Sequence, residues 1–242
     1  MTVSVDTSAL GPGVAVERFR AAGLPDWVQV HEYCEADMVR AYPVLTEELK
    51  KKPAMQKVRQ LREGVYSLAW GFHGCALNIW FQSIPGESRP AFCWVFEDDV
   101  GFTGDLADFF AATHHETADL LADTIKPVSQ TWFWWDTVSD EYDARVPLQD
   151  RWEAREHVQR FSRSLLDGLH QLAAEHRCAA WSEQSTPSLC QHLDLEMAQI
   201  DPVFISRPRF SWDTRLEESD WLALVSARSP RFRNKLYHAL KF

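Results

Sequence analysis

The run AFCWVFEDDV, residues 91–100, constrains the fold more than any other stretch of the chain. It opens with an apolar segment of strand length, which is typical of a central strand covered on both faces of a sheet. Glu97, Asp98 and Asp99 follow directly. Because ligands bind beyond the carboxyl ends of the strands in open α/β sheets, these acids stand where a ligand site is expected.

Strand and helix patterns alternate along the chain. The expected strands are TVSVDTS, WVQVHEY, the run before Glu97, PVSQTWFWWDTVS and PVFISRPRF. The expected helices are AVERFRAAGL, residues 35–49 with an interruption at Pro43, residues 66–84, DLADFFAATHHETADLLADTI, residues 152–176 and the segment after CAAWSE. This alternation predicts an α/β fold with a mainly parallel sheet flanked by helices.

Composition narrows the classes of partner. The net charge is −10, and general binding to nucleic acid needs concentrated positive charge, so that class is excluded. The final segment, ARSPRFRNKLYHALKF, is a local basic exception that either contacts a diphosphate or solvates a terminal helix.

Cysteine usage and hydropathy bear on the compartment. Five cysteines without a CxxC pair indicate small buried side chains under reducing conditions rather than a disulfide framework. The chain has no apolar run of transmembrane length and no basic segment before an apolar one at its start. We therefore expect a cytoplasmic protein without a transmembrane segment, with a lumenal enzyme cut from its anchor as the alternative.

Three adjacent carboxylates repel one another. Two unit charges about 4 Å apart cost about 1 kcal/mol in bulk water and about 4 kcal/mol at an effective dielectric of about 20. Bound Mg²⁺ or Mn²⁺ would offset this repulsion, because both ions take carboxylate oxygens together with substrate phosphates. Protonation of one carboxyl, or a solvated turn that caps the helix near Gly104 or Asp105, would also relieve it.

Residues 74–110, GCALNIWFQSIPGESRPAFCWVFEDDVGFTGDLADFF, resemble the core of the family 25 type glycosyltransferases, the lipopolysaccharide and collagen galactosyltransferase group. In that family a helix with a GCALSH pattern leads into a strand ending in LEDDV and then into an F…DF segment. The resemblance implies a GT-A-like (Rossmann-like) fold and a single glycosyltransferase-like domain over residues 1–242.

The same resemblance implies a donor site. Glu97, Asp98 and Asp99 would hold Mn²⁺ or Mg²⁺ and the diphosphate of a nucleotide sugar, with a UDP-sugar as the first expectation, and a glycan or another acceptor would receive the sugar. The family's Ser-His is Asn78 and Ile79 here, and Asn78 is a further candidate for contact with the donor.

Sugar transfer requires a neutralised leaving diphosphate, which a metal on Asp99 with Asp98 or Glu97 would supply as a Lewis acid. Inversion also requires a base for the acceptor's proton. Glu183, in AAWSEQSTP, is the first candidate for that base, with capping of the following helix as its alternative role. Asp136, after TWFWW, is a second candidate acid for the acceptor pocket.

Aromatic and histidine residues supply weaker candidates. The chain has 11 Trp, which indicates a heavily aromatic core or a cleft that stacks on rings. In TWFWWDT, one of Trp132, Trp134 and Trp135 is a candidate for stacking on a sugar while the others enter the core. His73 is expected in the core, the neighbours His114 and His115 at the surface, and His238 is a minor candidate for a metal or phosphate contact.

The first hypothesis is a metal-dependent nucleotide-sugar glycosyltransferase. The alternative is a transferase-like protein that binds carbohydrate or another partner without catalysis, which the missing family histidine favours. A metal-dependent phosphoesterase is the third hypothesis, and it requires a second group of acids or histidines converging on Glu97, Asp98 and Asp99.

Overall fold

The computed structural model describes residues 1–56, 67–211 and 213–241. The helices are α1 (Val14–Ala21), α2 (Glu35–Ala41), α3 (Pro43–Lys51), α5 (Leu68–Gly71), α6 (His73–Ser83), α7 (Leu106–Thr113), α8 (Asp140–Arg145), α9 (Arg163–His176), α10 (Ser182–His192) and α11 (Glu218–Ser226). The strands are β1 (Thr2–Asp6), β2 (Gln29–Tyr33), β3 (Phe92–Phe96), β4 (Gly101–Phe102), β5 (Leu120–Pro127), β6 (Trp152–Ser162), β7 (Met197–Gln199), β8 (Ile205–Phe210) and β9 (Leu236–His238).

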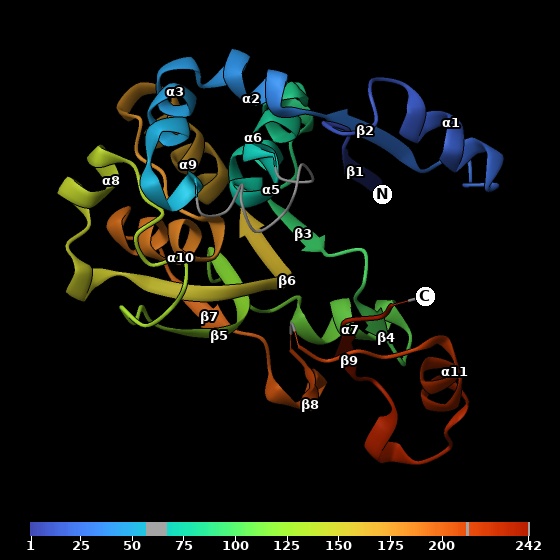
Figure 1. Ribbon diagram of the computed structural model, residues 1–242. Coiled ribbons are helices and arrows are strands. Elements are labelled where there is room, and N and C mark those ends of the chain that lie inside the picture. Colours follow the sequence, from blue (N-terminus) through green and yellow to red (C-terminus); the bar gives the residue numbers. More distant parts are fainter. Residues whose placement is uncertain (57–66, 212, 242) are drawn as a thin grey trace.

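These strands form a central sheet of order β3-β6-β5-β7, a β1-β2 pair and a small sheet of order β4-β9-β8 (Figure 1). Strand β6 runs antiparallel to both β3 and β5, whereas β5 and β7 are parallel. The fold is α/β as expected, but the expectation of a mainly parallel sheet is wrong. An apolar run predicts burial and not direction, and the connection from β5 to β6, which contains the short helix α8, brings the chain back antiparallel.

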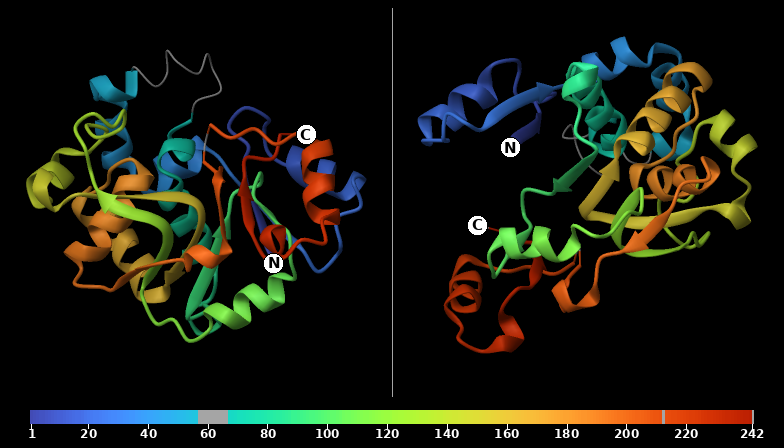
Figure 2. Two further views of the ribbon diagram at one scale, coloured as in Figure 1. Left: turned by 90° about the horizontal axis from the view of Figure 1, so that it is seen from below. Right: turned by 180° about the vertical axis from the view of Figure 1, so that it is seen from behind.

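The central sheet is covered on both faces. Helices α6, α9 and α10 pack on one face around Phe81, Phe161 and Leu166, and α2 and α3 pack outside them. On the other face, α7 and the small β4-β9-β8 sheet enclose Phe109 and Val158. Both views in Figure 2 show the small sheet and α11 on the side away from α9 and α10.

Several local expectations are confirmed, and one continuous helix is not. The strands before and after α1, the helix break at Pro43 and the strand before Glu97 lie where the sequence predicts them. The helix expected over residues 66–84 is two helices, α5 and α6, separated at Phe72, and its first residue lies outside the described part of the chain.

Three further expectations are wrong. The sequence LLADTI is the start of strand β5 rather than helix, and the residues after Pro127 form turns instead of the expected aromatic strand. Residues 152–176 were expected as one helix, but β6 occupies the first part and α9 the second. The spacing of apolar residues in this segment wrongly predicted a helix. Val158 and Phe161 lie on opposite faces of strand β6 and enter different hydrophobic cores.

None of the described helices has the length and apolar content that crossing a bilayer requires. All five cysteines lie in described segments and are unpaired. This agrees with the expectation that they are not a disulfide framework.

Substitution of Gly101 tests how tightly the small sheet is packed. A Cβ there would lie 2.5 Å from a ring carbon of Trp221 and 2.8 Å from Cδ1 of Leu240. We expect Gly101→Ala to lower the free energy of unfolding by about 1–3 kcal/mol, because both side chains would have to shift. Gly86→Ala is the matched control, since nothing lies within 4 Å of its Cβ. Urea unfolding measures both, and equal stability of the two variants would contradict the packing.

Candidate metal and acid site

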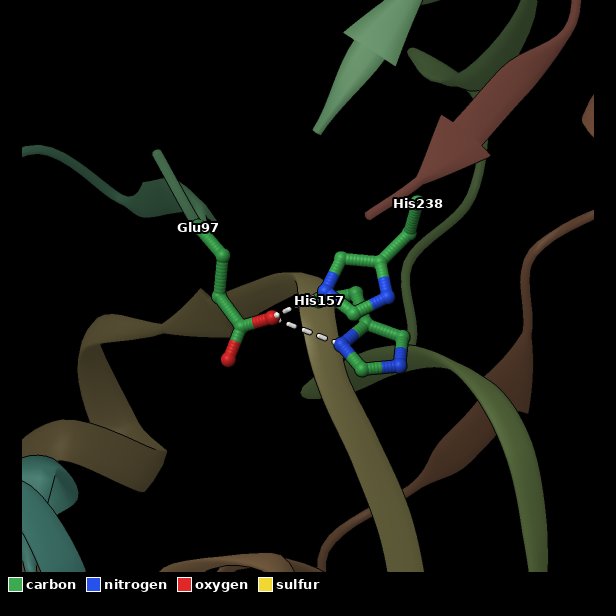
Figure 3. A group of neighbouring side chains, drawn as sticks. All are labelled: Glu97, His157 and His238. Atoms are coloured by element: carbon green, nitrogen blue, oxygen red, sulfur yellow. Dashed lines mark hydrogen bonds and ion pairs between the residues drawn. The ribbon is translucent and has the colours of Figure 1, made fainter. Parts of the chain in front are cut away.

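Glu97 is the centre of a group of titratable side chains. It follows β3, and its N–H donates to the carbonyl oxygen of His157 at 3.0 Å, which continues the pairing of β3 with β6. Its Oε2 lies 2.6 Å from Nδ1 of His157 and 3.2 Å from Nε2 of His238. Figure 3 shows both imidazoles on the same carboxylate oxygen. Strands β3, β6 and β9 therefore each bring one side chain to this point.

A bulge in β6 places His157. Ala122 of β5 pairs with Gln159, but the next residue, Asp123, pairs with Arg155. Strand β6 therefore inserts three extra residues, from Glu156 to Val158, where β5 inserts none. Such bulges bend a strand and re-aim its side chains, and they are common beside active sites.

Asp99 approaches His238 from the same turn. The N–H of Val100 donates to the carbonyl oxygen of Glu97, and Oδ1 of Asp99 lies 3.0 Å from Nε2 of His238. The ammonium group of Lys241 pairs with the other oxygen of Asp99. Asp98, between the two acids, is exposed. Glu97 and Asp99 are thus the two acids of the motif that meet the histidines.

The electrostatics of this group follow from its pairs. Burial by itself would raise the pKa of Glu97, but hydrogen bonds from His157 and His238 outweigh it and hold that pKa well below the usual range. Burial lowers the pKa of His238, and the Glu97 and Asp99 carboxylates more than reverse this. The two imidazole rings stack, with centroids 3.6 Å apart and an interplanar angle of 19°.

The donor atoms suit one metal ion. Oxygen of Glu97 and nitrogens of His157 and His238 all lie within 4.8 Å of one another. The Glu97 oxygen lies 2.6 Å and 3.2 Å from the two nitrogens, which is within the roughly 4.4 Å that two ligands about 2.2 Å from one ion can span. Nδ1 of His238 lies 3.2 Å from the carbonyl oxygen of Ser211, and a hydrogen bond there leaves Nε2 facing the acids. Imidazole nitrogens favour Mn²⁺ or a later divalent ion over Mg²⁺, which takes oxygen ligands.

A second group of acids lies within electrostatic range. His73, at the start of α6, has Nδ1 3.1 Å from Oε2 of Glu156. Burial, together with the charges of Glu183 and Glu97, raises the pKa of Glu156 well above its ordinary value. Burial lowers the pKa of His73 and outweighs the charge of Glu97. This pair therefore favours its uncharged form.

Glu183 lies in the first turn of α10. The N–H of Gly74 donates to Oγ of Ser182 at 3.1 Å, which joins the starts of α6 and α10. Burial raises the pKa of Glu183 to about 7, assisted by the charges of Glu97 and Glu153. Glu183 thus shares an electrostatic environment with Glu97.

The structure separates the other predicted residues. Asp136 is half-buried in the turn before α8. Asn78 is buried and lines a cavity of about 10 Å³ between α6, α9 and α10, so it lies outside the group around Glu97. His114 and His115 are exposed at the end of α7, as expected.

Sequence reasoning missed Glu156 and His157, because both fall in the segment expected as an amphipathic helix. The signal available was two adjacent titratable residues within a run that is otherwise rich in buried positions. His238 was a minor candidate, and the structure places it against both Glu97 and Asp99.

Comparison with known proteins gives a likeness in structure but no family. No family model matches the chain, and no curated protein matches it. Among solved structures, the apo form of mouse xyloside xylosyltransferase 1 aligns with 98% of this chain and 83% of its own, at 14% sequence identity and a TM-score of 0.47. That likeness is too weak to assign a family or an activity, so the functional argument depends on the residues themselves.

The raised pKa of Glu183 predicts a pH-dependent stability. Between its ordinary value of 4.5 and about 7, the folded protein holds a proton that the unfolded chain has lost. The free energy of unfolding of the wild type should therefore fall across this window relative to Glu183→Gln, by about 1–3 kcal/mol.

Urea unfolding at pH 5 and pH 8 measures the difference. Glu87→Gln is the control, because Glu87 is exposed in the turn after α6. A stability gap between wild type and Glu183→Gln that stays constant from pH 5 to pH 8 would contradict the assignment.

Proposed function

We propose that the protein is a metal-assisted glycosyltransferase that moves a sugar from a nucleotide sugar, first of all a UDP-sugar, to a glycan or other acceptor. The observation that carries the proposal is the meeting of Glu97 and Asp99 with His238 at 3.2 and 3.0 Å. The resemblance of residues 74–110 to family 25 type glycosyltransferases adds support, because the acids of its LEDDV motif correspond to Glu97, Asp98 and Asp99.

Glu97, Asp99 and His238 would hold the metal, with His157 as a further ligand. When bound, the ion would supply positive charge to the leaving diphosphate as a Lewis acid. The binding would require the ring nitrogens to be free of protons, so it would weaken at low pH.

Lys241 gives the site a second positive charge. Its ammonium group already reaches Asp99, and it comes from the basic final segment that was predicted either to contact a diphosphate or to solvate a helix. That segment follows α11 and runs through a short turn into β9, so the helix alternative does not apply to Lys241. A cation next to the metal ligands would help to bind the diphosphate.

Glu183 is the proposed base. A general base works best when its pKa lies near the operating pH, and burial brings the pKa of Glu183 to about 7. The proton of the acceptor hydroxyl would pass to this carboxylate as the sugar is transferred. Asp136 remains a candidate for an acceptor contact.

Two other functions stay open. A carbohydrate-binding protein without catalysis would still bind the acceptor glycan but would no longer bind a nucleotide sugar. A metal-dependent phosphoesterase is favoured by the His73–Glu156 pair, which is the kind of second group that this chemistry requires near Glu97.

Release of UDP from UDP-sugars, with and without Mn²⁺, tests the proposal. We expect Mn²⁺-dependent turnover that falls at least about 10- to 100-fold in Asp99→Ala and in His238→Ala, because each loses a metal ligand. His115→Ala is the matched control, since His115 is exposed at the end of α7. Thermal unfolding of each variant checks that it folds.

The outcomes separate the three functions. Glycan binding in calorimetry without nucleotide binding or turnover would favour the non-catalytic protein. Metal-dependent hydrolysis of bis-p-nitrophenyl phosphate, lost in both His73→Ala and Asp99→Ala, would favour the phosphoesterase. A thermal-shift panel of UDP, GDP and CMP compounds identifies the nucleotide, because a ligand that binds only the native state raises its stability.

A further inference from the structure

A cluster of stacked aromatic rings lies beside Glu183. The rings of Trp134 and Trp181 are parallel within 4°, with centroids 3.8 Å apart. Trp70 meets Trp181 edge-on at 5.3 Å, and Phe133 meets Trp134 edge-on at 4.4 Å. Trp181 is buried, whereas Trp70 is 38% exposed and Phe133 is 54% exposed. The cluster therefore presents aromatic surface to solvent over a buried support.

The backbone holds this cluster in place. The N–H of Trp181 donates to the carbonyl oxygen of Thr137 at 2.8 Å, which ties the aromatic turn to the start of α10. Gly71 approaches so closely that a Cβ there would lie 2.5 Å from the Trp181 ring. Aromatic rings fixed in this way lose little conformational entropy when they bind a ligand.

The cluster is joined to the proposed base. Trp181 lies two positions before Glu183, and a hydrogen bond from its side chain to the Glu183 carboxylate partly opposes the rise in the pKa of that group. Trp181 therefore lies between the exposed rings and the carboxylate of Glu183. A ligand stacked on these rings would have one edge near Glu183.

We propose that the exposed rings of Trp70 and Phe133, with half-buried Trp134 between them and Trp181, form a stacking subsite for the sugar ring of the acceptor. The inference rests on the proposed function, and it names the acceptor class as a pyranoside. A sugar has an apolar C–H face that suits an aromatic ring and hydroxyl groups that donate to carboxylates. Asp136, two residues after Trp134, and Glu183, two residues after Trp181, supply such hydrogen-bond acceptors.

Charge argues against a nucleotide as the occupant. Glu183 lies within electrostatic range of the Glu153 carboxylate, and two carboxylates repel phosphate. A neutral ligand with hydroxyl groups meets no such repulsion. The acceptor would then lie on the rings while the diphosphate lies by the metal ligands and Lys241.

Saturation-transfer NMR on the full chain tests the subsite without the donor. The probes are methyl glycosides of glucose, galactose and xylose at tens of millimolar, with UMP for comparison. We expect at least one glycoside to bind, and its dissociation constant to rise about 3- to 10-fold in both Phe133→Ala and Phe133→Leu. Phe133→Leu keeps an apolar side chain and removes the ring, so it isolates stacking from packing.

Trp27→Ala is the matched control, because Trp27 is 68% exposed in the segment before β2. The subsite is overturned if no glycoside binds the wild type, if binding is unchanged in both Phe133 variants, or if UMP displaces the glycoside. It is also overturned if the rings instead join two copies of the chain, seen as a dimer that Phe133→Ala dissociates. Glycoside binding that depends on Phe133, without turnover of any donor, would keep the subsite and reject the transferase.

Discussion

The hydrogen bonds from His157 and His238 to Glu97 are the interactions on which the rest of the site depends. They offset the charge of a carboxylate that burial would otherwise keep protonated. Burial raises the pKa of both Glu156 and Glu183, and the charge of ionised Glu97 adds to the rise in each. The pKa of Glu97 is thus held low while those of its two neighbours are raised, and separate acidic and basic groups result from residues of a single type.

The bulge in β6 makes this arrangement possible, and it has an energetic cost. Oε1 of Glu156 and Nε2 of His157 are buried without a hydrogen-bond partner among the described residues. Such groups cost about 1–3 kcal/mol each when they are left unsatisfied. A regular strand would pair its backbone more fully and would not turn two adjacent titratable side chains toward Glu97. These unsatisfied groups lower stability at the place where the titratable side chains are concentrated. Such a loss of stability is common at functional sites.

The sequence predicted the parts of the fold that local patterns determine. The apolar run before Glu97, the break at Pro43 and the acidic turn are encoded within a few residues, and each lies where it was expected. Strand direction and the β6 bulge depend on pairing between distant segments, so Glu156 and His157 were hidden inside an apparent helix. Val158 and Phe161 fitted a helical stripe because their spacing suits one face of a helix as well as two faces of a strand. Glu183 was recognisable because it stands at the start of a helix, although its link to Trp181 required the folded chain.

The contact between Asp99 and Lys241 joins residues 142 positions apart and ties the end of β3, an edge strand of the central sheet, to the final segment after β9. His238, on β9, reaches the same acids from the small sheet. A metal held there would add one more link between the two sheets, beside the hydrogen bond from the N–H of Leu240 to the carbonyl oxygen of Asp99. Part of the metal's binding free energy would then be folding free energy. The affinity for the ion and the stability with which strand β9 is attached would therefore report the same free energy.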